Sequence, residues 1–220
     1  MNLFPLNLDI RGRKAVVVGG GAVAERKCRS LLEAGASVTV IAPVVTPGVE
    51  ELLRQGRIFL LRRQYRTGDP TGALLLFAAT NDRSVNRTVA GDAKRLGILV
   101  CVTDAPEEGD FASPAVVRRG ELLLTISTGN RSPSLARRIR QELEGRYGPE
   151  YGSLVEFVGA LREKLLTEGR DSAYTTQLFN ELLQGDLSRL LNPVERERLF
   201  SIANPDPQGP LSPPDTEESP

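Results

Sequence analysis

The chain has 220 residues, of which 40% are apolar and 25% charged, as in globular proteins with room for one full domain and a smaller one. Its 28 basic and 28 acidic residues cancel, so the overall charge favours neither nucleic acid nor an anionic membrane as a partner. We find no signal-like N-terminal stretch and no apolar run near the roughly 20 residues that a membrane span needs. We therefore expect a soluble, cytoplasmic protein.

Histidine is absent, and the only cysteines are Cys28 and Cys101. This composition argues against a disulfide scaffold and excludes a histidine base and the commonest zinc sites. Any proton transfer must then fall to carboxylates, and we expect no permanent metal site.

Residues 14–27 carry the strongest motif, KAVVVGGGAVAERK. An apolar strand at 15–18 runs into three glycines and then into a helix whose apolar residues recur every three or four positions. Gly19, Gly21 and Ala24 match the G-x-G-x-x-A pattern, in which a dinucleotide pyrophosphate binds at the helix N-terminus. A purely structural turn would also require glycine, so this alternative stays open.

A second strand is predicted at 37–41. It is followed by Pro43 and not by the acidic residue that would bind the ribose hydroxyls of NAD, and no arginine stands there for the 2′-phosphate of NADP. The choice between the two cofactors is therefore open. Thr46 predicts the cap of the next helix, which ends before a third strand at 58–61.

The continuous apolar run at 73–79 is typical of a central parallel strand covered on both faces. Thr80 and Asp82 then predict the start of a helix that ends at Gly97, before a fifth strand at 98–102. The alternation of strands and helices predicts an α/β protein with a doubly wound parallel sheet of the Rossmann type.

The carboxyl ends of parallel strands meet at one edge of a sheet, so the glycine turn, Pro43, Val44, Thr80 and Asp104 should share that edge. Asp104 follows the fifth strand, where its carboxylate could face the nicotinamide end of a bound cofactor. An aspartate that bonds its own turn before Pro106 is an equally open alternative.

The second half of the chain has a different character. Residues 115–118 and 121–127 predict a hairpin, followed by a polar turn and a helix over 134–144. Seven arginines against three glutamates lie in 113–146, and guanidinium groups suit carboxylates or phosphates, although a solvated helix face would also explain some of them. The candidates near turns are Arg118, Arg119 and Arg131.

Leucines at helical spacing predict a helix around 154–165 and further helical segments at Leu178, Leu182 and Leu183 and at 187–191. The proline-rich, acidic stretch 204–220 is predicted to be disordered.

In chain order, the motifs VVVGGGAVAERK, LLEAGASVTVIAP, FAATND, VTDAP, FASPA and ISTGNRSPSLAR resemble the precorrin-2 dehydrogenase family, the dehydrogenase and ferrochelatase module of siroheme synthase. The likeness covers roughly the first 165 residues. It implies that the protein is a homodimer. It also implies a stand-alone form, without the methyltransferase region that is fused to this module in some members. The implied segments are an NAD-binding Rossmann domain at 1–112, a dimerisation segment at 113–147, a helical domain at 148–203 and the tail at 204–220.

The resemblance implies NAD-dependent oxidation of precorrin-2 to sirohydrochlorin, followed in some members by insertion of ferrous iron in the same pocket. By motif, Asp104 falls on the catalytic aspartate, while Thr128 keeps the hydroxyl of a pocket position and is grouped with Asn130 as substrate-binding. The cofactor-binding candidates are Gly19, Gly21, Ala22, Val23, Pro43, Val44 and Thr80.

An NAD-sensing regulatory domain without catalysis is the alternative function. Such a domain would bind the dinucleotide but would need neither Asp104 nor an arginine-rich second half. A precorrin-2 dehydrogenase would need Asp104 to accept a proton, and it would need arginines to bind the many carboxylates of precorrin-2.

Overall fold

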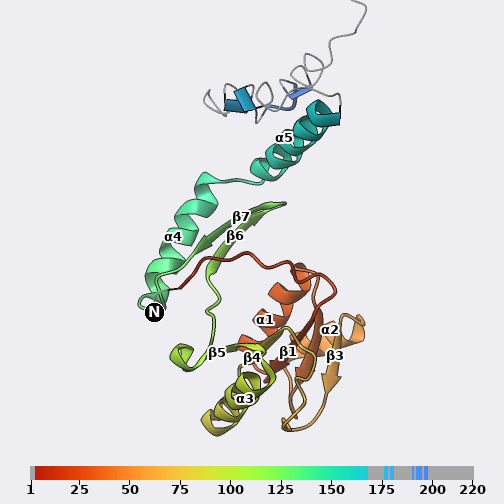
Figure 1. Ribbon diagram of the computed structural model, residues 1–220, viewed down its shortest axis with the longest axis vertical. Helices are drawn as coiled ribbons and strands as arrows, with labels where there is room; N and C mark the ends of the chain where they lie inside the picture. The colour runs from red at the N-terminus through yellow and green to blue at the C-terminus, as the bar shows by residue number, and fades with distance from the viewer. Residues whose placement is uncertain are drawn as a thin grey trace, which may run out of the picture. The chain divides into compact units, whose positions relative to one another are not determined.

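The computed structural model describes residues 3–167 and, further on, 176–177, 179–180, 190, 192–194 and 196–197 (Figure 1). Two compact units are present, one of Met1–Pro114 with Ser127–Ala136 and the other of Ala115–Ile126 with the chain from Arg137 on. The leucines at 178, 182 and 183, most of 187–191 and the tail at 204–220 lie outside the described residues.

The first unit is built on five parallel strands in the order β3-β2-β1-β4-β5. Every residue of β4 is buried, as expected of a central strand that is covered on both faces. The doubly wound α/β sheet predicted from the sequence is thereby confirmed. The strands are β1 (Lys14–Val18), β2 (Ser37–Ile41), β3 (Ile58–Leu61), β4 (Leu75–Ala78) and β5 (Leu99–Val102).

Helices cover both faces of this sheet (Figure 1). On one face, Cys28 of the first helix and Leu52 of the second pack with Val17 of β1. On the other face, Val89 of the third helix packs with Val16, because successive strand side chains point to opposite sides. These helices are α1 (Ala22–Glu33), α2 (Pro47–Arg54) and α3 (Arg83–Leu96).

The helix ends follow the predicted signals. The Thr46 side chain caps α2 by accepting a hydrogen bond from the Val49 amide at 3.4 Å. Asp82 caps α3 by accepting from the Ser84 amide at 2.8 Å. At the other end of α3, Gly97 adopts φ 65°, a left-handed conformation that suits glycine.

The connection from β3 to β4 differs from the other crossovers, because residues 62–74 contain no helix. Arg63 holds this loop together through two hydrogen bonds of 2.8 Å to the Asp69 carboxylate. The Tyr65 hydroxyl donates to the buried Asp92 carboxylate of α3 at 2.7 Å. This crossover is therefore fixed to α3 by hydrogen bonds of polar side chains, without a helix of its own.

The second unit contains the predicted antiparallel hairpin, formed by β6 (Ala115–Arg119) and β7 (Leu122–Ile126). A Cβ on Gly152 would lie 3.1 Å from the Arg119 carbonyl carbon, so glycine lets the following helix approach the hairpin closely. That helix is α5 (Glu150–Thr167). The preceding helix, α4 (Pro133–Arg146), begins in the first unit and ends in the second. None of the helices in the described ranges combines the length and apolar character needed to cross a membrane.

Candidate active site

A cavity of about 1340 Å³ lies at the carboxyl edge of the parallel sheet. The glycine turn after β1 and the loops after β2, β4 and β5 all contribute to its wall. All of its lining residues belong to the first unit. This is where α/β sheets bind ligands, beside the point at which helices change from one face to the other. The structure brings together Gly19, Gly21, Ala22, Val23, Pro43, Val44, Thr80, Asp104 and Asn130.

The glycines of the turn serve different purposes. Gly19 has φ 130°, and a Cβ there would lie 2.2 Å from the Ala79 carbonyl oxygen. A Cβ on Gly20 would lie 2.0 Å from the Val44 carbonyl oxygen. Both positions therefore require glycine for the fold itself. A Cβ on Gly21 would meet nothing within 4 Å, so the space beside it is left open for a ligand.

The N-terminus of α1 faces this space. Gly21 is its N-cap and provides no side-chain hydrogen bond to the first amides. The leading amides of an α-helix have no partner within the helix and attract anions such as a pyrophosphate. The turn therefore fits a dinucleotide, with room beside Gly21 and an uncapped helix end next to it.

The loop after β2 is fastened to the glycine turn. The Thr46 amide donates to the Gly20 carbonyl at 2.9 Å, and the Thr46 hydroxyl donates to Glu25 of α1 at 2.7 Å. These contacts hold Pro43 and Val44 at the cavity wall, where the Val44 side chain is 77% exposed. The Thr46 hydroxyl and, less strongly, the Arg29 guanidinium lower the pKa of Glu25, which stays ionised within this network.

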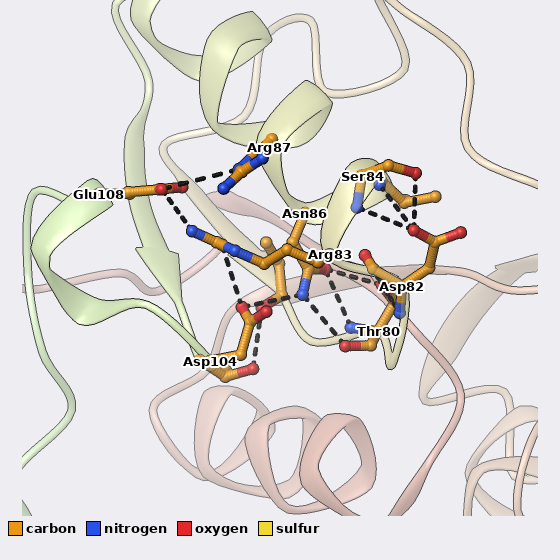
Figure 2. A network of polar contacts seen from close by, with 11 residues as sticks. Thr80, Asp82, Arg83, Ser84, Asn86, Arg87, Asp104 and Glu108 are labelled. Atoms are coloured by element: carbon orange, nitrogen blue, oxygen red, sulfur yellow. Dashed lines mark hydrogen bonds and ion pairs between the residues drawn. The ribbon is translucent and has the colours of Figure 1, made fainter.

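The Asp104 carboxylate lies on the same wall and is 37% exposed. Figure 2 shows its polar contacts with the start of α3. Its Oδ1 accepts a hydrogen bond from Asn86 Nδ2 at 2.9 Å and lies 3.6 Å from Arg83 Nη1. The partners of this carboxylate are thus side chains from the start of α3 and not amides of its own turn. A half-exposed carboxylate on a cavity wall can accept a proton from a bound ligand.

Asn86 is fully buried, and its orientation follows from its partners. The Thr80 amide can only donate, and it does so to Asn86 Oδ1 at 3.2 Å. Asn86 Nδ2 must therefore face the other way, where it donates to the Thr80 carbonyl at 3.1 Å and to Asp104. The amide joins the loop after β4 to the carboxylate that follows β5.

Asn86 was not among the residues predicted from the sequence, although a signal for it exists. It lies three, four and seven positions before Val89, Ala90 and Ala93, which are all buried. A polar amide on the buried side of a helix needs hydrogen-bond partners, and at this position they lie at the predicted site. Arg83 was missed as well, and it also forms an ion pair with Glu108 of the short helix η1 (Pro106–Glu108).

The candidate substrate-binding residues have varied environments. Asn130 lines the cavity with φ 63°, and the Thr128 hydroxyl lies 3.1 Å from the Ser132 carbonyl within a local turn. Arg131 is exposed. Arg118 and Arg119 belong to the hairpin of the second unit, where the Arg119 guanidinium donates to backbone carbonyls, including that of Tyr147 at 2.9 Å. Their part in substrate binding stays a prediction.

Metal ligands do not cluster in the described residues, where no group of three or more His, Cys, Asp or Glu could hold an ion. The arrangement combines a glycine turn of the dinucleotide-binding type, the carboxylate of Asp104 and a cavity larger than a typical ligand pocket. The fold and the site define a dinucleotide-binding protein of the α/β class.

Comparisons with known proteins give the family. The model of a family described as putative NAD(P)-binding matches residues 6–115, and the chain belongs to this family. A solved structure of SirC, described as a precorrin-2 dehydrogenase, is similar with a TM-score of 0.77 and 28% identity, covering 91% of this chain and 98% of that one.

Curated relatives carry the name siroheme synthase. The protein of Chromobacterium violaceum is 38% identical over 188 residues, which are 86% of this chain and 40% of the relative. That of Pseudomonas aeruginosa is 39% identical over 203 residues, 91% of this chain and 44% of the relative. The chain thus spans less than half the length of these relatives.

Proposed function

We propose that the protein catalyses the NAD-dependent oxidation of precorrin-2 to sirohydrochlorin in siroheme biosynthesis. The observation that carries the proposal is one cavity lined by both a dinucleotide-type glycine turn and Asp104. The likeness to SirC and to the siroheme synthases supports the choice of substrate. We place the reaction in the cytoplasm, where free thiols such as those of Cys28 and Cys101 persist.

The residues divide the chemistry between them. When bound, NAD⁺ supplies the hydride acceptor of the oxidation. The amides at the start of α1 hold its pyrophosphate, and Pro43 and Val44 border its adenosine half. Asp104 takes the proton that leaves the tetrapyrrole as the hydride is removed, so that two hydrogens are lost in all. Asn86 and Arg83 hold Oδ1 of this base and leave Oδ2 for the proton.

Insertion of ferrous iron into the product, which the resemblance implies for some members, stays a prediction. Of the two aspartates at the cavity, Asp82 caps α3, and Asp104 is the one that could take protons from the pyrrole nitrogens. A homodimer is also proposed, since Leu122, Leu123 and Leu124 of β7 are only partly buried even though α5 packs against the hairpin.

The function is tested by incubating the purified protein with precorrin-2 and NAD⁺ under anaerobic conditions. We expect the absorption spectrum of sirohydrochlorin to develop together with the 340 nm absorbance of NADH. NADP⁺ in place of NAD⁺ establishes which cofactor is used. Binding of NAD⁺ by calorimetry without any oxidation of active precorrin-2 would contradict the proposal and favour the NAD-sensing regulatory domain.

A further inference from the structure

We propose that Lys27 is a subsite for a carboxylate of the tetrapyrrole substrate. This inference rests on the proposed function, because it names the group that holds one acidic side chain of that substrate. In the sequence, Lys27 is the last residue of the motif at 14–27, and the motif by itself predicts no role for it.

Lys27 lies at the wall of the cavity, with its ammonium group over an aromatic ring. It lies on α1 and forms part of the cavity wall together with Cys101 and Ser113. Its Nζ lies 5.8 Å from the centroid of the Phe77 ring of β4, and that ring packs edge-on against Phe111 at 5.4 Å. The ammonium group is therefore held against an aromatic surface, which attracts a cation but leaves its charge unneutralised.

No carboxylate of the described residues lies within ion-pair distance of Lys27 Nζ. By contrast, Arg29 of the same helix pairs with Glu25 at 2.8 Å. Burial, and to a lesser degree the neighbouring positive charge of Arg26, lowers the pKa of Lys27, although the nearby Cys101 opposes this shift. An ammonium group that is partly buried without an anion is unfavourable in the ligand-free protein.

Cys101 does not supply the missing negative charge. Burial raises the pKa of its thiol, despite the proximity of Lys27 and hydrogen bonds with Ser113. The group is therefore a neutral thiol near pH 7, and a thiolate–ammonium pair is not formed. A ligand in the cavity can supply the counter-charge that the neighbouring side chains of Lys27 do not.

The neighbours of Lys27 indicate which ligand this is. They belong to β4 and β5, whereas the loop with Pro43 and Val44 follows β2 on the other side of β1. Lys27 thus lies at the β4–β5 half of the sheet, after which Asp104 follows, and away from the adenosine half of a dinucleotide. Its helix α1 covers one face of this half, and α3, which holds Asp104, covers the other. A tetrapyrrole with acidic side chains presents carboxylates there, and an ammonium on an apolar wall binds a carboxylate with a charge-assisted hydrogen bond.

The first test observes Lys27 directly, without turnover. The chain has four lysines, Lys14, Lys27, Lys94 and Lys164, so ¹³C-dimethylation gives a simple NMR spectrum that substitutions assign. Because burial lowers the pKa of Lys27, we expect its signal to titrate below the ordinary range of a lysine. Saturating uroporphyrin, a stable porphyrin with eight carboxylates, should raise this midpoint by about one pH unit, and NAD⁺ alone should leave it unchanged.

The second test compares matched variants. It measures the Kd for uroporphyrin from the fluorescence of the porphyrin, since the chain contains no tryptophan. Lys27→Met should weaken uroporphyrin binding at least ~10-fold and change the Kd for NAD⁺ less than about twofold. Lys27→Arg should retain most of the porphyrin affinity, and Lys94→Met, on an exposed part of α3, should retain all of it.

The subsite would be overturned by no binding of uroporphyrin, by an unmoved Lys27 midpoint when uroporphyrin is bound, or by a midpoint raised equally by NAD⁺ alone. Oxidation of precorrin-2 by Lys27→Met with unchanged KM would also remove the subsite and leave the proposed function standing. Conversely, Lys27-dependent porphyrin binding without oxidation would retain the subsite and reject the dehydrogenase.

Discussion

Asp104 offers two chemically different carboxylate oxygens. Oδ1 accepts the Asn86 amide at 2.9 Å and faces Arg83 at 3.6 Å, while no described residue forms a hydrogen bond or ion pair with Oδ2. A base that is anchored through one oxygen keeps the other in a defined direction, which suits proton transfer from a bound substrate.

Removal of the carboxylate should separate binding from turnover. We expect Asp104→Ala to bind NAD⁺ with an affinity within about twofold of wild type and to lose about 10²–10⁴-fold in kcat for precorrin-2 oxidation. Calorimetry with NAD⁺ and the sirohydrochlorin spectrum measure the two properties. Turnover at the wild-type rate would show that another group is the base.

Asn86 should control the pH at which this base works. Asn86→Asp keeps an oxygen for Thr80 but places a second carboxylate against Asp104, and like charges at this distance disfavour ionisation. The acidic limb of the pH–rate profile should move up by at least about one pH unit. Asn81→Asp, an exposed position on the same cavity, is the control with the same charge change. Equal profiles for the two variants would exclude the positioning role.

At the scale of elements, the turn between β1 and α1 combines two requirements. The lack of a side chain at Gly19 lets the backbone of the loop after β4 pass close to the turn. The lack of a side chain at Gly21 leaves space in the cavity. The structural explanation of the glycine motif therefore holds for Gly19, while dinucleotide binding beside Gly21 stays a prediction.

Two alanine substitutions should separate these requirements. Gly19→Ala would be strained and clash with the Ala79 carbonyl, and we expect a loss of at least about 2 kcal/mol in the free energy of unfolding. Gly21→Ala should cost no more than about 1 kcal/mol as a changed N-cap, yet weaken NAD⁺ binding at least ~10-fold. Urea unfolding measures the free energy of unfolding, and calorimetry measures the affinity for NAD⁺. A Gly21→Ala protein with full affinity would mean that no ligand approaches this amide.

At the scale of the whole molecule, the hairpin of the second unit is the candidate for self-association. Val116 of β6 is 39% exposed and pairs with the exposed Thr125 of β7, whose leucines at 122–124 are only partly buried. Apolar side chains on a two-stranded hairpin gain most when a second copy covers them.

We therefore expect light scattering after size exclusion to give roughly twice the 23.9 kDa of one chain. Val116→Glu should shift the protein toward the monomer, because a charge would be buried at the interface. Leu96→Glu, at a position of similar exposure on α3, should not. A wild-type protein that elutes as a monomer at micromolar concentration would contradict the proposed homodimer.

The sequence by itself determined the order of strands and helices, the parallel sheet, the hairpin and the glycine motif. These features depend on local periodicity and on turn residues such as Gly97 and Thr46, which act within a few positions along the chain. The loop at 62–74 was not foreseen, because its anchor is a hydrogen bond from Tyr65 to Asp92 of a helix 27 positions away.

Only the tertiary structure decided which side chains meet at the site. Asn86 and Asp104 are 18 positions apart and touch because α3 packs beside the end of β5. Lys27 stands without an anion because no acidic side chain of the described residues reaches the part of the wall it faces. Hydrophobic patterns report burial but not neighbours, since the direction and partners of a polar side chain depend on how distant elements pack.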